Sequence, residues 1–197
     1  MASPNVRIAH DDAEAWDVAA KLALAGWIAA DGKLSRTTAY KFSWDKALQQ
    51  TGDSGTHLQY THARLCSLEN KAKSVWPEFD FANTLESAQA PSIGADALAV
   101  LDCLDSLTPA LENALIALEP QYIIRFMFRL CQVANKSLHT VKVIGNSRRS
   151  GEMATGGASR SCGPKSVNAP QLVMLLTVRN VLADLMKLVG IEPLNRL

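Results

Sequence analysis

Residues 52–77 read GDSGTHLQYTHARLCSLENKAKSVWP, a turn that leads into one amphipathic helix. The glycines at both ends of Gly52-Asp53-Ser54-Gly55 favour a turn. Thr56 and Gln59 match the S/T-x-x-E/Q capping box of a helix start, and the apolar side chains after them keep helical spacing up to Trp76-Pro77. The stretch therefore predicts a turn and a helix of about 20 residues.

The segment before this turn predicts one long helix and one short helix. From Asp11 to Ala30 the residues are strong helix formers, and apolar side chains recur every three or four positions, at Trp16, Ala20, Ala23, Trp27 and Ala30. Ser43 is a suitable N-cap for a brief helix that runs through Leu48.

The segment after Trp76 is less regular and then strongly helical. Residues 78–90 are typical of a connection, whose structure the sequence leaves open. Ser92–Leu104 and Ser106–Leu118 predict two helices, or one helix broken near Pro109. Their outer face is acidic, at Asp96, Asp102, Asp105 and Glu112.

Pro120 opens a helix that is apolar around most of its circumference and so belongs in the core. Its polar residues form one narrow line, the basic stripe: Arg125, Arg129, Gln132 and Lys136. Between Gly145 and Asn168 the chain is rich in Gly, Ser and Arg, which predicts a long flexible loop. Asn168 and Pro170 begin a last helix with a broad apolar face, and Gly190 and Pro193 end it. With no strand run of useful length, the fold class expected is all-α, a helical bundle.

Composition fits a globular protein of one domain, or one domain with an appendage. The chain has 197 residues, of which 48% are hydrophobic and 20% charged. No stretch approaches the roughly 20 uninterrupted apolar residues of a membrane span, so we expect a soluble protein. Four cysteines without a paired motif indicate reduced thiols inside a cell, and the acidic stretch Met1–Asp17 shows no visible import or secretion signal.

Charge is divided along the chain. Residues 1–119 hold 9 Lys and Arg against 16 Asp and Glu, whereas residues 120–197 hold 11 against 3. A basic half of this kind suits a polyanion such as RNA, although chance is the plainer alternative.

Several enzymatic or metal-binding readings are weaker than plain structural ones. Gly145–Gly151 is the nearest match to a phosphate loop, but it follows a helix rather than a strand. His62 and Cys66, one turn apart, could share a metal or form a thiol nucleophile, yet they lack further ligands and an orienting group, so a surface His and a core Cys are favoured. A solvated acidic face explains the carboxylates better than acid–base catalysis does: Glu69, Asp102 and Asp105.

Three blocks of the sequence carry a family resemblance. The first comprises Tyr40-Lys41-Phe42-Ser43-Trp44-Asp45, the Gly-Asp-Ser-Gly turn and Leu58-Gln59-Tyr60-Thr61-His62-Ala63-Arg64. The second runs from Glu119-Pro120 through Arg125-Phe126-Met127-Phe128-Arg129-Leu130 to Ala134-Asn135-Lys136. The third is Val178-Arg179-Asn180-Val181-Leu182-Ala183-Asp184-Leu185-Met186-Lys187-Leu188-Val189-Gly190-Ile191-Glu192-Pro193. Together these blocks resemble the anticodon-binding domain of arginine–tRNA ligases, and the first is most similar to the mitochondrial branch.

This resemblance implies a class I aminoacyl-tRNA synthetase anticodon-binding domain of the DALR type at residues 41–197, with the flexible loop at 145–168. Residues 1–40 would be a helix and connection left from the link to a catalytic domain. That domain, which uses ATP to activate arginine, is absent here, since neither a His-x-Gly-His element nor a Lys-Met-Ser-Lys-Ser-like loop is found. We therefore expect no catalytic residue, no bound ATP and no metal in this chain.

The resemblance also implies the RNA-binding residues. Tyr60 matches a tyrosine that stacks on an anticodon base, and Arg64, at i+4 on the same helix face, matches an arginine that could reach phosphate or base. A buried core tyrosine and a surface salt bridge remain the respective alternatives.

Five further residues complete this predicted RNA-binding set. His57 stands where the family more often has Tyr or Phe, which weakens one stacking contact. Leu197 stands where members commonly end in Met, so an apolar contact to the anticodon loop is expected. Arg125, Arg129 and Lys136 are the expected phosphate contacts, with a solvated face as the alternative.

The partner expected is an arginine tRNA, bound by a monomer without a membrane or a metal. The location expected is the mitochondrial matrix or the cytoplasm. Two alternatives stay open: a stand-alone, non-catalytic tRNA-binding adaptor, and a helical interaction module that has lost RNA binding.

Overall fold

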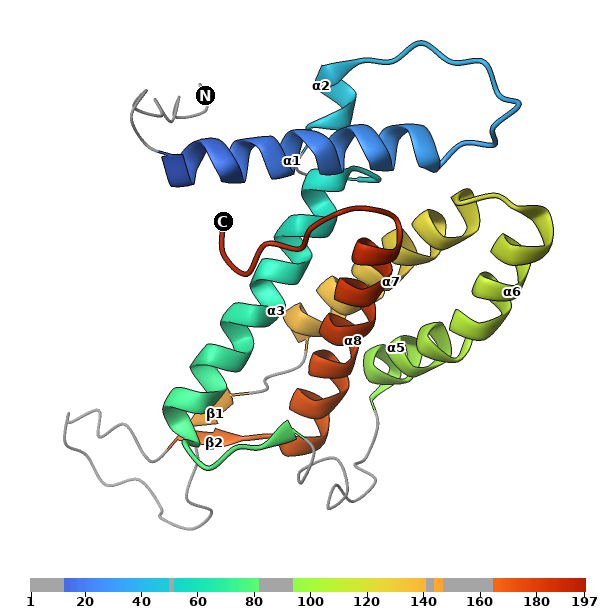
Figure 1. The fold of residues 1–197 in the computed structure, drawn as a ribbon. Coiled ribbons are helices and arrows are strands. Elements are labelled where there is room, and N and C mark those ends of the chain that lie inside the picture. The colour runs from blue at the N-terminus through green and yellow to red at the C-terminus, as the bar shows by residue number, and fades with distance from the viewer. Residues whose placement is uncertain (1–12, 50–51, 82–93, 141–143, 147–164) are drawn as a thin grey trace, which may run out of the picture.

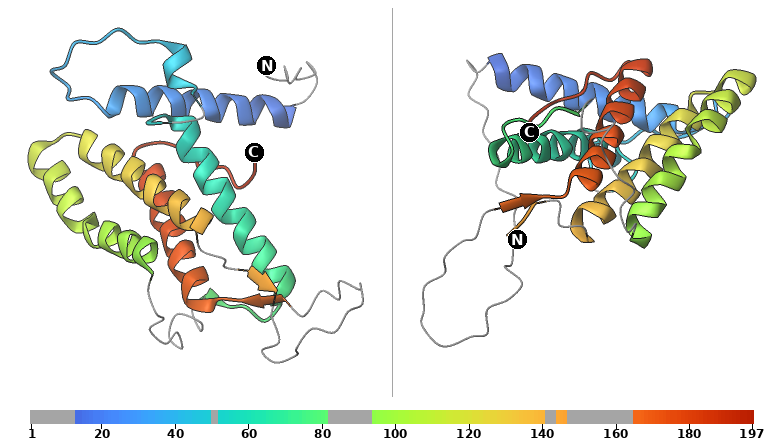
Figure 2. Two further views of the ribbon diagram at one scale, coloured as in Figure 1. Left: turned by 180° about the vertical axis from the view of Figure 1, so that it is seen from behind. Right: turned by 90° about the horizontal axis from the view of Figure 1, so that it is seen from below.

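The computed structural model describes residues 13–49, 52–81, 94–140, 144–146 and 165–197. The regular secondary structure of these residues is helical apart from one pair of three-residue strands (Figure 1). The elements in chain order are α1 (Ala13–Gly32), α2 (Trp44–Ala47), α3 (Gly55–Val75), α5 (Ala95–Asp105), α6 (Leu107–Ala117), α7 (Gln121–Thr140), β1 (Ile144–Asn146), β2 (Lys165–Val167) and α8 (Ala169–Leu188). The all-α fold class is confirmed, and the bundle seen from behind and below is shown in Figure 2.

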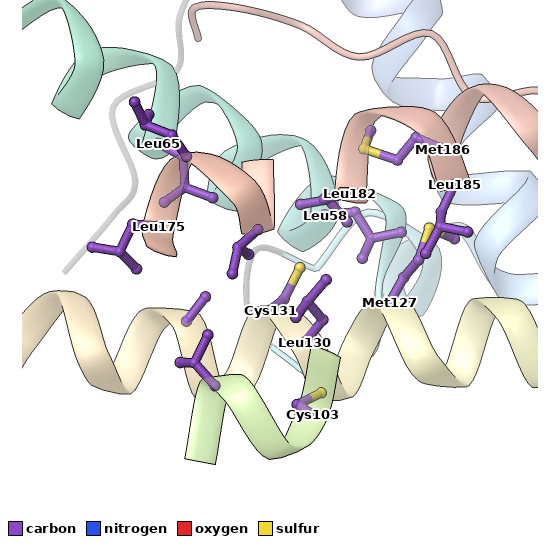
Figure 3. Packing of buried hydrophobic residues seen from close by; sticks show 14 of the residues in the cluster. Leu58, Leu65, Cys103, Met127, Leu130, Cys131, Leu175, Leu182, Leu185 and Met186 are labelled. Atoms are coloured by element: carbon purple, nitrogen blue, oxygen red, sulfur yellow. The ribbon is translucent and has the colours of Figure 1, made fainter. Parts of the chain in front are cut away.

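The core lies between α3, α7 and α8, with α5 closing it on the far side of α7 (Figure 3). As the sequence predicts, α7 is a core helix, because seven of its apolar side chains are buried: Ile124, Phe126, Met127, Phe128, Leu130, Cys131 and Ala134. They meet α8, which buries Leu172, Leu175, Leu176 and Leu182 completely. The four residues of the basic stripe are exposed, as the period of the helix requires.

Helix α1 lies across one end of α3 (Figure 1), and small residues make the contact. A side chain at Gly55 would overlap the backbone of Ala25, so only glycine permits this approach. Ala25, Gly26 and Ala29 are therefore the buried residues of α1. The sequence prediction of the apolar face was wrong, since Trp16 and Trp27, which are too large for so close a contact, are about half exposed.

Helix α3 begins differently from the capping box expected of Thr56 and Gln59. Ser54 is the N-cap, and its hydroxyl accepts from the His57 backbone N–H at 3.2 Å. The Gln59 side chain points away from the cap and is buried, bonding instead to a distant segment. Ser43 also precedes α2 as predicted, but its side chain makes no cap bond.

The connection between α5 and α6 falls at Ser106 rather than near Pro109. Pro109 sits in the first turn of α6, where its missing N–H costs nothing. At the other end of the bundle β1 pairs antiparallel with β2, Ile144 facing Val167. These strands were not predicted, because three residues carry no alternation to detect. The predicted connection and loop fall mainly at 82–93 and 147–164, outside the described residues.

Helix α8 is long and apolar enough, by length and composition, to cross a membrane. Within the bundle, however, nine of its residues are buried against the other helices, which accounts for its composition. Its start agrees with the sequence, since the Asn168 side chain accepts from the Gln171 N–H at 3.3 Å and Pro170 lies in the first turn. The described cysteines Cys66, Cys103 and Cys131 are free and buried, and burial raises the pKa of the Cys131 thiol to about 12.

Candidate nucleic-acid interface

The outward side of α3 presents an aromatic ring with a guanidinium beside it. Tyr60 is 48% exposed, so it is not the buried core tyrosine of the alternative reading. Arg64, one turn further along, places its guanidinium carbon 5.6 Å from the centre of the Tyr60 ring. A cation at this distance interacts with the face of the ring and limits the orientations of both side chains. An open ring face beside a cation suits a nucleobase and its phosphate.

Arg64 is held in place by a residue of α7. Its Nη1 donates to the Asn135 side-chain oxygen at 2.8 Å, and the Asn135 amide donates to the Thr61 hydroxyl at 2.8 Å. The Arg64 contact is therefore a hydrogen bond to a neutral amide, which leaves the charge of the guanidinium uncompensated by this partner. Asn135 belongs to the second block of the resemblance, but the sequence predicted no role for it.

The inward side of the same run holds a distant part of the chain. Gln59 donates from Nε2 to the Glu192 carbonyl at 2.8 Å and accepts at Oε1 from the Leu194 N–H at 2.9 Å. His62 Nδ1 lies 2.8 Å from the Leu194 carbonyl. Residues 191–197, here called the tail, thereby cross α3 beneath α1 (Figure 1).

The tail brings two more side chains to Tyr60. Arg196 and Leu197 line a hollow of about 440 Å³ on the surface of α3. We call this the Tyr60 hollow, and its lining residues are Tyr60, Ala63, Arg64, Ser67, Leu68, Lys71, Leu138, Arg196 and Leu197. Three predicted site residues thus meet here, Tyr60, Arg64 and Leu197, although Leu197 is far from the others in sequence.

Two cations of the Tyr60 hollow were missed by the sequence reasoning. Lys71 lies seven residues after Arg64, two turns along the same face, so helical spacing could have found it. No local signal could have placed Arg196, because only the path of the tail brings it there. Arg196 also pairs with Glu14 of α1, an exposed pair that leaves it close to solvent.

The remaining predicted residues lie elsewhere. His57 is half-buried in the first turn of α3 and does not line the Tyr60 hollow. Within the basic stripe, Arg125 donates from Nε to the Lys33 carbonyl at 3.1 Å, and Lys136 pairs with Asp96 at 2.9 Å. Arg129 is exposed on the same face of α7. The structure does not place these four residues in the lining of the Tyr60 hollow, and their contact with RNA stays a prediction.

The competing site readings find little support in the described residues. His62 is buried, not on the surface, and Cys66 lies beside it at 3.8 Å from Nδ1, but no group of three or more metal-ligating side chains occurs in the described ranges. Burial raises the pKa of the Cys66 thiol, which opposes its use as a nucleophile. Glu69 pairs with Arg179 and Lys73, so its carboxylate is structural. Gly145–Gly151 lies largely outside the described residues.

Comparison with known proteins settles the family. Residues 58–197 match the family profile described as the DALR anticodon binding domain. The chain belongs to this family. The three-block resemblance to arginine–tRNA ligases is thereby confirmed. The match begins at Leu58, so the DALR domain includes the whole Tyr60 hollow.

Relatives of this DALR domain are named as arginine–tRNA ligases. The chain is 30% identical over 181 residues to the probable mitochondrial arginine–tRNA ligase of Mus musculus, which matches 92% of this chain and 27% of that protein. The chain is 27% identical over 184 residues to the mitochondrial arginine–tRNA ligase of Saccharomyces cerevisiae. This match covers 91% of this chain and 25% of that protein. The arginyl-tRNA synthetase of Thermus thermophilus has the same fold, with a TM-score of 0.66 at 21% identity over 92% of this chain and 27% of that one. The chain thus spans about a quarter of the length of the curated relatives it matches.

Proposed function

We propose that this chain binds the anticodon stem-loop of an arginine tRNA and that the Tyr60 hollow receives the anticodon. The observation that carries the proposal is the exposed Tyr60 ring, braced by Arg64 and bordered by further cations. Stacking of a base on an aromatic ring contributes roughly 1–3 kcal/mol and tolerates any base. Discrimination between anticodons would then fall to the directional donors of Arg64 and to the shape that Leu197 gives the hollow.

The charges of the Tyr60 hollow fit the backbone of a nucleic acid. Lys71 and Arg196 line it together with Arg64, so three cations border the hollow. Each cation that neutralises a phosphate releases counterions, which makes binding weaker as salt rises. With few such contacts, we expect weak and salt-sensitive binding by this chain.

The wider role proposed is arginine–tRNA ligation. The relatives named above are arginine–tRNA ligases, and the chain spans about a quarter of their length. We propose that arginine and ATP are handled outside these 197 residues and that the DALR domain contributes recognition of the tRNA. Both of those relatives are mitochondrial proteins, so we propose a mitochondrial location, with the cytoplasm as the alternative.

Binding of a labelled anticodon stem-loop tests this function. The wild-type chain is expected to bind the stem-loop of an arginine tRNA more tightly than the same stem-loop with another anticodon. Tyr60→Ala is expected to reduce that affinity by about ten- to a hundredfold. Tyr40→Ala is the matched control, since Tyr40 is 42% exposed on the connection between α1 and α2, away from the Tyr60 hollow.

The outcomes separate the alternatives. Preference for the arginine anticodon in the wild-type chain, together with affinity that falls in Tyr60→Ala and is kept in Tyr40→Ala, supports anticodon recognition at this site. If both stem-loops bind equally and Tyr60→Ala does not change their affinity, nonspecific electrostatic attraction explains the binding. That result would overturn the proposal. No binding at all would favour a helical interaction module without an RNA ligand.

A further inference from the structure

The tail leaves α8 in a fixed direction. Gly190 has φ +85°, a left-handed conformation, and the last turn closes with Gly190 N–H to the Lys187 carbonyl at 3.0 Å and Ile191 N–H to the Met186 carbonyl at 2.8 Å. Ile191 is 1% exposed and anchors the chain after the turn. The tail is thereby aimed across α3 rather than into solvent.

The side chain of Gln59 then forms two hydrogen bonds with the backbone of the tail. Its carboxamide donates to the Glu192 carbonyl and accepts from the Leu194 N–H, so both polar ends of one buried side chain are used on one segment. The side chain is fully buried. A buried amide without these partners would be unfavourable, so the two bonds tie the tail to α3 strongly.

His62 provides the third bond from the next turn of α3. A carbonyl can only accept, so His62 Nδ1 carries the proton and donates to Leu194. Burial is the main cause that lowers the pKa of His62 below its ordinary value of 6.5, which keeps the ring neutral near pH 7. By contrast, the tail's links to α1 are surface ion pairs that contribute little: Lys21 to Glu192, which is partly exposed, and Glu14 to Arg196, which is exposed.

We propose that Gln59 and His62 are positioning residues for RNA binding. By fixing the backbone of residues 192–194 on α3, they hold Leu197 beside Tyr60 in the hollow. The residues that contact RNA and those that hold the tail therefore alternate along one helix. This inference rests on the proposed function, because it assigns the Tyr60 hollow to an anticodon.

The first variant removes the two hydrogen bonds of Gln59 to the tail without creating a cavity in the core. Gln59→Met keeps a side chain of similar length but cannot donate to or accept from the tail. It is expected to weaken binding of the arginine stem-loop by about three- to tenfold, and to speed hydrogen exchange at the Leu194 N–H while the amides of α7 stay protected. Val100→Ala is the matched control. It removes buried apolar contacts of α5, away from the tail, so it should lower the stability of the fold and leave the affinity for the stem-loop unchanged.

A double-mutant cycle separates positioning from a direct or general effect. In the Leu197→Ala background the side chain that the tail delivers is already missing, so Gln59→Met is expected to cost little further affinity. If Gln59→Met costs as much in that background as in the wild-type chain, Gln59 does not act through the tail. Leu194→Ala, which loosens the tail and leaves α3 unaltered, covers the case in which Gln59→Met does not fold, and it too should weaken binding.

The remaining results bear on the two proposals separately. If the wild-type chain binds the stem-loop and neither Gln59→Met nor Leu194→Ala weakens it, the positioning role is overturned and the proposed function stands. If the wild-type chain shows no binding, the proposed function fails and the role of the tail fails with it. Weakened binding with faster exchange at Leu194 and a non-additive cycle supports both.

Discussion

The guanidinium of Arg64 lies over the ring of Tyr60, 5.6 Å from its centre, and is anchored from the other side by Asn135. The two contacts use different properties of the group: its charge faces the ring and one of its donors faces α7. A planar, forked cation satisfies both at once, which a lysine ammonium cannot do from the same position. The two side chains therefore have a fixed relative orientation in the free chain.

This arrangement predicts that charge alone does not replace Arg64. Arg64→Lys is expected to weaken binding of the arginine stem-loop by about two- to tenfold, because the planar contact with Tyr60 and the bond to Asn135 are both lost. Titration of the labelled stem-loop measures it. Lys46→Ala, an exposed cation on α2, serves as control, and full affinity in Arg64→Lys would show that only the charge matters.

The basic stripe predicts a different signature. If Arg129 contacts a phosphate, Arg129→Ala should weaken binding similarly for every anticodon and reduce the slope of log affinity against log salt by about 0.7–0.9. Arg129 is the informative position, since Arg125 and Lys136 already have protein partners. If the salt slope of Arg129→Ala equals that of the wild-type chain, the basic stripe is an ordinary solvated face and not a phosphate-binding surface.

His62 predicts that stability falls on the acid side. Its folded-state pKa lies below 6.5, so under acidic conditions the unfolded chain binds a proton more readily than the folded one. Its contribution is complete above pH 6.5 and is lost as pH falls below it, since a charged ring would be buried near Arg179 and Lys187 of α8 and beside Cys66 of α3. Urea unfolding between about pH 5 and 7.5 measures the trend. In His62→Gln the pH dependence should be smaller, and an unchanged curve would exclude His62 as its source.

Gly55 predicts the consequence of adding one methyl group. Gly55→Ala is expected to force α1 away from α3 and to cost about 1–3 kcal/mol of the free energy of unfolding, because the new Cβ would meet the backbone of Ala25. Thermal unfolding measures it. Gly94→Ala is the control, since a Cβ there meets nothing within 4 Å, and equal stability of the two variants would contradict the close contact.

Local patterns in the sequence determined most of the helices. The period of apolar residues identified α3, α7 and α8, and the four residues of the basic stripe are exposed where that period places them. The same rule put Tyr60 and Arg64 on one face, because side chains four residues apart on a helix are neighbours wherever the helix packs. These are properties of a single helix and need no knowledge of its surroundings.

Which partner each face meets was decided only by the tertiary structure. Gln59 fits a capping box by spacing, yet it is buried and pairs with the tail, more than 130 residues away. The two tryptophans of α1 fit an apolar face, yet Gly55 leaves room only for Ala25 and its small neighbours. Leu197 lines the same hollow as Tyr60 because the chain turns back at Gly190 and its next residues hydrogen-bond to Gln59. The period of a helix is set by backbone geometry, so it can be recognised in the sequence. Contacts between distant segments depend on the shapes of their surfaces and on which buried donors meet which acceptors, and one sequence alone does not reveal these pairings.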